Sequence, residues 1–282
     1  MPISFTKCQA AGNDFLVVRW SELEALGLKE SDLPELARAM CDRHKGVGAD
    51  GLEVLDAPGI DRGAADASLR IFNSDGSEAE ISGNGTRCVA ATLETESPSA
   101  TPLRITTQAG LKVLRVVERI GHAFVFDMTM GRPTYDPGEV CCTLETDLGA
   151  STVTILNVGN PQCVLFVEDF DSDWRALGKL IERHARFPQR TNVSFVKPLD
   201  GHTIDVRFWE RGAGETISSG TGSTGAAVAA ILSGKASSPV RVTTPAGDLT
   251  VTWSGDDVTM RGPAAVVATG NYHGYPRQTA KP

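Results

Sequence analysis

One motif occurs twice in this chain of 282 residues, and its repetition is the feature that most constrains the fold. The first copy spans residues 73–87 and contains Ser82-Gly-Asn-Gly, while the second spans residues 210–222 and contains Ser219-Gly-Thr-Gly. Each copy leads directly into a stretch of small residues that favours a helix packed closely against its neighbours. A motif repeated in this way indicates an internally duplicated protein.

Three further pairs of segments match, and they occur in the same order in both halves. Residues 11–18 match 158–165, residues 43–52 match 183–193, and residues 103–110 match 240–247. Ser219 lies 137 positions after Ser82, and Val240 lies 137 positions after Leu103, so the element between these motifs keeps its length. We therefore predict two homologous halves, residues 1–137 and 138–282, with a seam near residues 135–150.

Local patterns suggest the elements of each half. Residues 21–40 carry helix signals, with Ser31 to Pro34 as an N-terminal cap, and small-residue helices are expected at 90–93 and 226–232. Alternating β-branched residues interrupted by Ala-Gly predict hairpins at 103–117 and 240–253. The predicted fold class is α/β (α+β), a pseudo-symmetric pair of domains in which each mixed sheet wraps around a central helix. The two helix N-termini would then point at a cleft between the halves.

Composition excludes several classes of function. With 41% apolar and 22% charged residues, the chain is typical of a globular protein, and its net charge of −8 argues against a nucleic-acid partner. It contains no apolar run long enough for a membrane span, and its first residues lack a signal-peptide pattern. The six cysteines show no regular spacing, which favours reduced thiols in a cytoplasmic protein, and no zinc-like cluster or other metal site is expected.

The duplicated Gly-x-Gly turns predict a pair of anion-binding sites. Backbone N–H groups without helical partners and the positive end of the helix dipole meet at such a turn. One such turn is weak evidence, because glycines before helices are common, but two at equivalent positions are much stronger. A pseudo-symmetric site is suited to epimerisation, in which a proton leaves one face of a carbon and another arrives on the opposite face.

The paired motifs resemble the active-site loops of the diaminopimelate epimerase family, and the resemblance extends over nearly the whole chain, from Gly12-Asn-Asp-Phe15 to Arg261-Gly-Pro263. It implies cofactor-independent epimerisation of LL- to meso-diaminopimelate, a step in the synthesis of lysine and peptidoglycan precursors. In this family a cysteine opens each Gly-x-Gly, and Ser82 and Ser219 occupy these two catalytic positions here.

The resemblance also implies a set of substrate-binding residues. Neutral amides and one Glu–Arg pair form a dense field of donors and acceptors that is suited to a zwitterionic amino acid. By match to the family motifs, the predicted substrate-binding residues are Asn13, Asn73, Gly83, Asn84, Asn160, Asn192, Glu210, Arg211, Gly220 and Thr221. A single asparagine such as Asn13 is better explained as a turn residue, but Asn13, Asn73, Asn160 and Asn192 together, in matching motifs, are not.

The departures from the family pattern concern acid–base chemistry. A hydroxyl is far less acidic than a thiol and acts as a base only when another group takes its proton. Gln162 stands where the family usually has a histidine, so no such group is evident. Cys88 and Cys163 match cysteines of the family that are not catalytic, and Cys8 is interpreted as a buried residue of the first strand.

Two acidic residues precede Ser82 and Ser219 at similar spacing. Glu78 and Glu215 resemble, in position, the carboxylates used by phenazine-biosynthesis relatives of this fold. For Glu215 we expect instead that it organises its loop by accepting backbone N–H bonds.

Three hypotheses remain open on the sequence alone. The first is a diaminopimelate epimerase with turnover impaired by the two serines, and the second is a divergent racemase or dehydratase on the same scaffold. The third is a non-catalytic or substrate-trapping amino-acid-binding homologue, whose serines arose by deliberate exchange or by natural drift. All three predict a small amino-acid ligand without a cofactor, since neither loop has a Schiff-base lysine or a dinucleotide motif, and the family resemblance suggests a homodimer.

Overall fold

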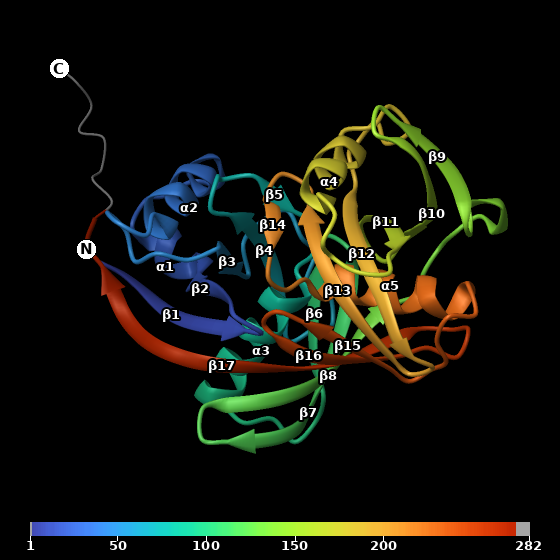
Figure 1. The fold of residues 1–282 in the computed structure, drawn as a ribbon. Helices are drawn as coiled ribbons and strands as arrows, with labels where there is room; N and C mark the ends of the chain where they lie inside the picture. The colour runs from blue at the N-terminus through green and yellow to red at the C-terminus, as the bar shows by residue number, and fades with distance from the viewer. Residues whose placement is uncertain (1, 275–282) are drawn as a thin grey trace. The chain divides into compact units, whose positions relative to one another are not determined.

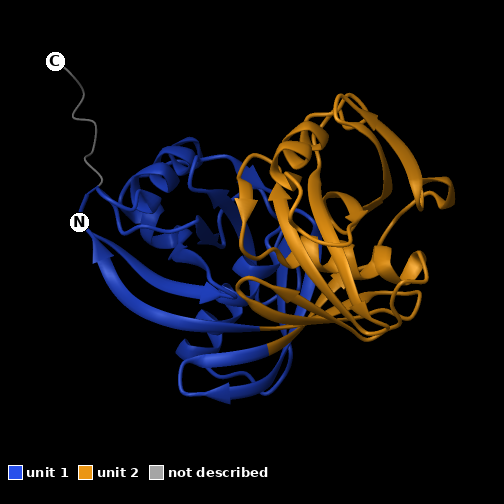
Figure 2. Ribbon diagram, in the orientation of Figure 1, with its two compact units in different colours: residues 1–125, 263–282 blue, residues 126–262 orange. Residues whose placement is uncertain are grey.

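The computed structural model describes residues 2–274 of the chain (Figure 1). The chain divides into two compact units, which Figure 2 distinguishes by colour. Unit 1 comprises residues 1–125 and 263–282, and unit 2 comprises residues 126–262. A single boundary in the sequence therefore does not separate the two units, because the last described strand begins in unit 2 and ends in unit 1.

Within the described residues, unit 1 contains three α-helices and most of the strands from the first half of the sequence. Its elements in chain order are β1 (Ile3–Ala10), β2 (Asn13–Arg19), α1 (Trp20–Ala25), η1 (Glu30–Asp32), α2 (Leu33–Cys41), β3 (Gly51–Leu55), β4 (Ala67–Asn73), β5 (Glu78–Ala79), α3 (Gly83–Glu96), β6 (Leu103–Thr107), β7 (Gly110–Ile120) and the start of β8 (Ala123–Gly131).

Unit 2 repeats this series with two α-helices. After the end of β8 its elements are η2 (Pro137–Glu139), β9 (Cys142–Thr146), β10 (Gly149–Asn157), β11 (Pro161–Phe166), α4 (Trp174–Glu182), β12 (Asn192–Asp200), β13 (Thr203–Glu210), β14 (Gly214–Thr216), α5 (Gly220–Leu232), β15 (Val240–Thr244), β16 (Gly247–Thr252) and the start of β17 (Val258–Tyr272).

The two units share one pattern of strand pairing, which confirms the predicted duplication. In unit 1, β1 and β2 are antiparallel, β2 and β3 parallel, β3 and β4 antiparallel, and β4 and β6 parallel. In unit 2 the same sequence of pairings joins β10 to β11, β11 to β12, β12 to β13, and β13 to β15. The predicted fold, a mixed sheet around a central helix in each half, is therefore the observed one.

The central helices α3 and α5 are buried over most of their length. In α5 every residue from Gly220 to Ala230 is buried, and the helix packs against β10, β11, β12 and β13. A helix surrounded on all sides needs small or apolar residues all round, and its Gly-, Ala-, Ser- and Thr-rich sequence supplies them. Both helices begin at the Ser-Gly-x-Gly motif, several residues before the alanine-rich stretches that indicated them.

The outer helices follow an amphipathic pattern. Leu33, Leu36, Ala37 and Met40 are buried at helical spacing on α2, which packs against β3 and β4. The single predicted helix over 21–40 is observed as α1 and α2 with a 3-10 turn between them, since Gly27 breaks the helix with φ at +81°. Both predicted hairpins are confirmed, β6 with β7 and β15 with β16.

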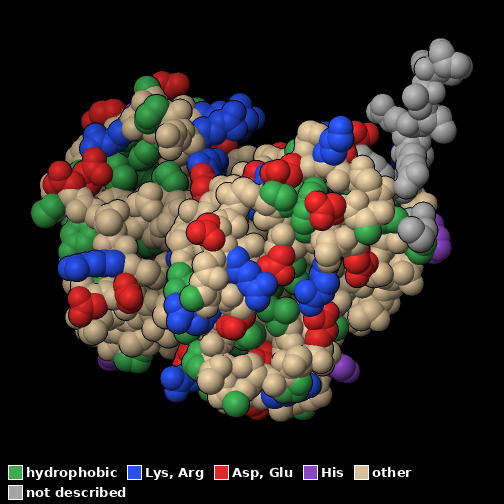
Figure 3. All heavy atoms as spheres, turned by 180° about the vertical axis from the view of Figure 1, so that it is seen from behind, with side chains coloured by type: hydrophobic (Ala, Val, Ile, Leu, Met, Phe, Trp, Pro, Cys, Tyr) green, Lys and Arg blue, Asp and Glu red, His purple; other side chains and the backbone are tan. Residues whose placement is uncertain are grey.

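The molecular surface mixes both signs of charge. Figure 3 shows acidic and basic side chains interspersed on the face it presents, with hydrophobic side chains scattered among them. Several surface carboxylates are held by arginines, as in the pair of Arg261 with Asp127 at 2.7 Å. Within residues 2–274, no helix combines the length and apolar character needed to cross a membrane.

Candidate active site

Ser82 is the N-cap of α3 in unit 1. Its backbone is extended, with φ −128° and ψ 118°, and its Oγ accepts a hydrogen bond of 3.0 Å from the N–H of Gly85. Its carbonyl oxygen accepts a further bond of 2.9 Å from the N–H of Thr86. The side chain is therefore fixed at the positive end of a helix of 14 residues.

Ser219 takes the same position on α5 in unit 2. Its φ and ψ are −145° and 122°, its Oγ accepts a 3.0 Å bond from the N–H of Gly222, and its carbonyl accepts a 2.9 Å bond from the N–H of Ser223. Only 3% of Ser219 is exposed, whereas Ser82 is half-buried. Sequence and geometry thus agree that each motif places one hydroxyl at a helix N-terminus.

The residues after each serine present backbone donors. The first N–H groups of a helix have no partner within the helix. Among the described residues, the N–H groups of Gly83, Gly220 and Thr221 have no hydrogen-bond acceptor. Each N-cap therefore combines a hydroxyl with backbone donors that are suited to a carboxylate.

Asn13 and Asn84 belong to one hydrogen-bonded chain in unit 1. Arg87 donates to Asn84 Oδ1 at 2.7 Å, Asn84 Nδ2 donates to Asn13 Oδ1 at 3.4 Å, and Asn13 Nδ2 donates to Asp50 Oδ2 at 2.6 Å. Burial lowers the pKa of Arg87 to about 10, and its guanidinium also donates to the carbonyls of Gly83 and Pro263. The chain ties the first turn of α3 to the start of β2.

A cluster of ion pairs anchors the other end of this chain. Arg43 contacts both Asp14 and Asp50 at 2.7 Å, and Lys7 contacts Asp14 at 2.9 Å. Burial alone would raise the pKa of Asp14, but the hydrogen bonds from Arg43 and Lys7 outweigh it and hold that pKa below its usual value. Asn13 is therefore oriented by a charged group, beyond what a simple turn requires.

Asn73 is placed differently from the other predicted residues of unit 1. Its Nδ2 donates to Ser77 Oγ at 2.9 Å, and its backbone closes the turn through Ser77 and Gly76. The side chain is half-buried at the end of β4. In this structure the residue does what an asparagine in a turn ordinarily does.

Asn160, Thr221 and Gln162 form the corresponding chain in unit 2. Gln162 Nε2 donates to Asn160 Oδ1 at 2.6 Å, and Asn160 Nδ2 donates to Thr221 Oγ1 at 3.2 Å. Gln162 is fully buried, packs against Gly225 in the second turn of α5, and leaves its Oε1 without a partner among the described residues. A neutral amide thus occupies the place where the family resemblance implied a histidine.

Asn192, Arg211 and Glu210 lie around the β13–β14 turn. Asn192 Oδ1 accepts from the backbone N–H of Arg211 at 3.0 Å, and its Nδ2 donates to the carbonyl of Pro161 at 2.9 Å. Glu210 and Arg211 are half-buried, and Arg211 Nη1 lies 3.4 Å from the carbonyl of Gln189. Asn192 therefore joins the start of β11 to the loop that follows β13.

The prediction for Glu215 is wrong. Instead of accepting backbone N–H bonds, its carboxylate accepts two bonds from Arg175, at 2.6 and 2.7 Å, which lower its pKa. Glu78 is similarly held by Arg70 at 2.6 and 2.9 Å. Both carboxylates are bidentate partners of arginines, an arrangement that favours a structural role over that of a free base.

None of the six cysteines is the N-cap residue of α3 or α5. All six are free thiols. Cys8 on β1 is fully buried, with its Sγ 3.2 Å from Thr92 Oγ1, nine residues or about 13 Å along α3 from Gly83. A hydrogen bond with Cys88 lowers the pKa of Cys8, and burial raises that of Cys88. Burial also raises the pKa of Cys163, so that thiol stays protonated.

The structure adds Glu53, which sequence analysis did not identify. It lies on β3, is fully buried, and neither carboxyl oxygen has a hydrogen-bond partner among the described residues. A Cβ built on Gly85 would lie 1.7 Å from Glu53 Oε1 and 3.2 Å from Ser82 Cβ, so the carboxyl group rests directly against the first turn of α3. Burial raises its pKa well above the usual value, and the nearby Cys8 raises it further.

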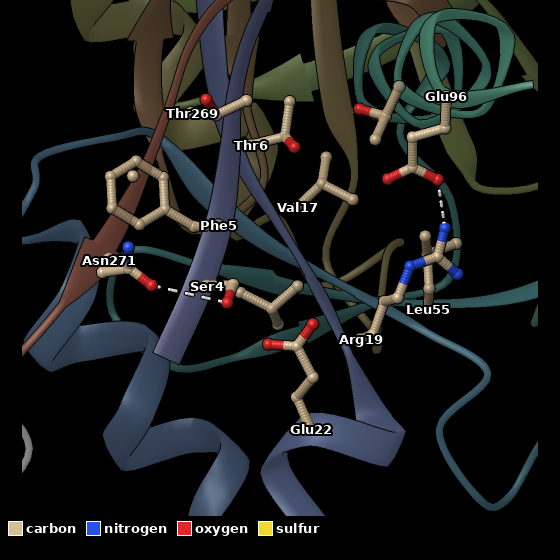
Figure 4. A pocket seen from close by; sticks show the side chains of 13 residues that line it. Ser4, Phe5, Thr6, Val17, Arg19, Glu22, Leu55, Glu96, Thr269 and Asn271 are labelled. Atoms are coloured by element: carbon tan, nitrogen blue, oxygen red, sulfur yellow. Dashed lines mark hydrogen bonds and ion pairs between the residues drawn. The ribbon is translucent and has the colours of Figure 1, made fainter. Parts of the chain in front are cut away.

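A pocket of about 330 Å³ lies elsewhere in unit 1 (Figure 4). It is lined by β1, β2 and β17 and reaches Glu96, the last residue of α3, which is about 21 Å along the helix from Ser82. Figure 4 shows Arg19 paired with Glu96 and Ser4 joined to Asn271. Arg19 and Glu96 pair with each other, and the pocket is separate from the N-cap.

Comparison with solved structures supports the fold. The chain superimposes on a hydroxyproline epimerase from Agrobacterium vitis with a TM-score of 0.75 and 16% identity, over 96% of this chain and 90% of the other. A phenazine biosynthesis protein from Bacillus anthracis gives a TM-score of 0.66 at 18% identity, over 96% and 99% of the two chains. At these identities the similarity establishes the architecture alone.

Sequence comparisons establish the family. The family model for diaminopimelate epimerase matches residues 5–135 and 154–267. A protein named diaminopimelate epimerase from Pelotomaculum thermopropionicum is 42% identical over 95% of this chain and 98% of its own length. One of the same name from Ectopseudomonas mendocina is 40% identical over 96% and 99%. Together with the duplicated fold, these matches show that the chain belongs to the diaminopimelate epimerase family.

Proposed function

We propose that this protein interconverts LL- and meso-diaminopimelate without a cofactor, with Ser82 and Ser219 in the positions of the two proton-transferring groups. The observation that carries the proposal is the pair of equivalent N-caps. Each holds a hydroxyl beside backbone donors, at 3.0 Å from the third N–H of its helix. Helix N-termini stabilise the carboxylate and the negative charge that develops when a proton leaves Cα.

The amide chains supply the proposed binding groups. Asn13 and Asn84 in unit 1, and Asn160 with Thr221 in unit 2, are linked by hydrogen bonds to the first turns of α3 and α5. Such preformed networks position an amino acid at small entropic cost. We include Asn73, Asn192, Glu210 and Arg211 in the proposed substrate site on the basis of the family motifs.

Serine makes the proposed reaction slow. A hydroxyl needs a neighbouring group to accept its proton, whereas a thiol at a helix N-terminus is readily ionised. We therefore expect the Ser82→Cys/Ser219→Cys variant to exchange the α-proton faster than the unmodified protein by a factor on the order of 10²–10⁴, the usual contribution of acid–base catalysis.

The test is α-proton exchange in heavy water, followed by NMR on LL-diaminopimelate, with both proteins measured side by side. Deuterium incorporation and formation of the meso isomer by the unmodified protein support the proposal. If neither protein exchanges the proton and calorimetry detects no binding of either diastereomer, diaminopimelate is not the substrate.

A second candidate is a binding protein without turnover. It is favoured by one observation: among the described residues, neither serine hydroxyl donates its proton to an acceptor. Binding without exchange by the unmodified protein, together with exchange by the double cysteine variant, would identify this function.

We further propose a cytoplasmic homodimer that takes a small amino acid as its ligand. The support is the family resemblance together with the acidic net charge of −8, which disfavours nucleic acid as a partner. Sedimentation equilibrium measures the oligomeric state directly, and a monomer at all concentrations would contradict this part of the proposal.

A further inference from the structure

Glu53 is the ionisable group that the proposed function leaves unexplained. A carboxyl group that is fully removed from water and has no hydrogen-bond partner is strongly destabilising. Its neighbours Leu52 and Val54 on β3 are buried aliphatic residues, as a strand covered on both faces requires. An apolar residue at position 53 would therefore serve the fold better than a glutamate does.

The position of Glu53 relative to α3 indicates what the carboxyl group can act upon. Its Oε1 lies against Gly85, the residue whose N–H donates to Ser82 Oγ. Any side chain at position 85 would meet this oxygen, so glycine permits the close approach. The carboxyl group and the Ser82 side chain therefore flank the same Cα in the first turn of the helix.

The other groups around Glu53 do not neutralise it. Cys8 on β1 and Cys88 on α3 are the titratable groups whose charges interact with it, and both are thiols. Arg87, the nearby cation of α3, is instead committed to Asn84 and to the carbonyls of Gly83 and Pro263. The carboxyl group therefore remains available for a proton.

We propose that Glu53 accepts the proton of Ser82, and thereby enables that hydroxyl to act as the base on one face of the substrate; this inference rests on the proposed function. Glu53 acts through Ser82 and makes no contact with substrate. No histidine is evident for this role in the sequence, whereas β3 places a carboxyl group against the first turn of α3.

The proton transfer balances. As the Cα–H bond of the substrate breaks, its proton passes to Ser82 Oγ, and the proton of Ser82 passes to the Glu53 carboxylate. The negative charge thereby moves from Glu53 to the substrate, where the α-carboxylate and the N-terminus of α3 stabilise it. The reverse transfer restores Glu53 and Ser82. Because burial raises the pKa of Glu53, its carboxylate is a stronger base than that of an exposed glutamate.

Unit 2 has no counterpart of this carboxyl group. Ser194 occupies the equivalent position, since Gln162 pairs with Asn192 on β12 as Phe15 pairs with Gly51 on β3. The first turn of α5 is covered instead by the Phe208 ring, whose nearest atom lies 2.8 Å from a Cβ built on Gly222. Ser194 is therefore the matched control position.

The experiment measures α-proton exchange as a function of pH for four proteins: the unmodified chain, Glu53→Gln, Ser82→Cys, and the variant that carries both changes. Ser194→Ala serves as the control, and calorimetry with meso-diaminopimelate reports binding. We expect Glu53→Gln to lower exchange by a factor on the order of 10² in the serine background while binding is retained. In the Ser82→Cys background the same change has little effect, because a thiol at a helix N-terminus ionises without help. Ser194→Ala leaves the exchange unchanged.

The pH profile separates this role from a structural one. The unmodified protein should gain exchange activity as Glu53 ionises with rising pH, and Glu53→Gln should lose this step. Glu53→Leu, which fills the same apolar surroundings, provides a second variant should the glutamine protein fold poorly.

The inference is overturned if Glu53→Gln keeps both the rate and the pH profile, or if it lowers exchange equally in the cysteine background. It is also overturned if the unmodified protein binds the ligand but never exchanges its proton. Absence of both binding and exchange in every protein, including Ser82→Cys/Ser219→Cys, would instead remove the proposed function on which the inference rests.

Discussion

The first turns of α3 and α5 are alike in backbone and different in what lies beneath them. Both begin with a serine N-cap whose Oγ accepts a 3.0 Å bond, followed by Gly-x-Gly. Beneath α3 lies the carboxyl group of Glu53, and beneath α5 lies the ring of Phe208. Duplication therefore preserved the geometry of the serine N-cap, while the group beneath it differs between the two units.

This difference shows that the group facing the N-cap can vary while the N-cap itself stays the same. The N-cap depends on local backbone geometry, which the motif enforces in both units. The group that faces the cap comes from another strand and is free to change, as Glu53 and Ser194 do. An asymmetric pair of caps is suited to a reaction whose two faces require different groups at a given moment.

The largest expected effect comes from replacing one of the two N-cap serines at a time by cysteine and comparing the rates of epimerisation. Because the ring of Phe208, and not a carboxyl group, lies against Gly222 in the first turn of α5, we expect Ser219→Cys to raise epimerisation by a factor on the order of 10² or more. Ser82→Cys should give a smaller gain, since Glu53 already supports the hydroxyl there. Product formation measured by chiral chromatography checks this order, and equal gains would show that the two caps are chemically equivalent.

Methyl groups placed at the two first turns should differ in their effect on stability. Gly222→Ala meets the rigid Phe208 ring at 2.8 and 2.9 Å, and we expect a loss of about 2–3 kcal/mol in the free energy of unfolding. Gly85→Ala meets the end of a flexible Glu53 side chain, which can move, so its loss should be about 1 kcal/mol. Urea denaturation measures both, with Gly85→Ala/Glu53→Ala as the control that should relieve the second clash.

Glu53 should give the stability of the protein a pH dependence that Ser194, its counterpart in unit 2, cannot give. The pKa of Glu53 is raised in the folded protein, so its contribution to stability is fully present below the unfolded-state pKa and is lost as pH rises through the folded-state value. Between these values the free energy of unfolding should fall by about 1.4 kcal/mol per pH unit through this group. Glu53→Gln removes that slope, whereas Ser194→Ala leaves it in place, as denaturation at several pH values would reveal; an unchanged slope in Glu53→Gln contradicts the assignment.

The smallest expected effect tests the capping hydrogen bond of the N-cap serine, which both units have. Ser82→Ala and Ser219→Ala each remove one capping bond of 3.0 Å and should each lower the free energy of unfolding by about 1 kcal/mol. Similar values, measured by thermal unfolding, would confirm that the caps are structurally equivalent. A large difference between them would place part of the asymmetry in the caps themselves.

Much of the architecture could be predicted from local sequence. The repeated Ser-Gly-x-Gly motifs and the hairpins around Ala109 and Ala246 depend on turns and periodicity, which short segments specify by themselves. The motifs indicated Asn13, Asn84, Asn160 and Thr221 as site residues, whereas the bonds from Asn84 to Asn13 and from Asn160 to Thr221 are seen only in the fold. The side-chain partners of Asn73 and Glu215 could not be predicted from these motifs. Asn73 bonds to the hydroxyl of Ser77 in its own turn, and Glu215 bonds to Arg175 on the distant helix α4.

Glu53 could not be identified from its own segment. In a strand of alternating residues, a glutamate between Leu52 and Val54 indicates a face exposed to water. Every residue of β3 is buried, however, because α2 covers one side and α3 the other. A comparison of Gly51-Leu-Glu53 with Asn192-Val-Ser194 would have provided a signal, since it sets a carboxylate against a hydroxyl at one duplicated position.

The passage of β17 from unit 2 into unit 1 has a consequence for biosynthesis. β17 is made long after β1, yet the two strands pair, and Ser4 bonds to Asn271 across 267 residues of sequence. Residues 126–262 form unit 2 without interruption, so all of this unit has been made before residues 263–272 of β17 complete unit 1. Unit 1 must wait with one edge of β1 unpaired, and the interval before β17 arrives is when the nascent chain is most exposed to aggregation and in greatest need of chaperones.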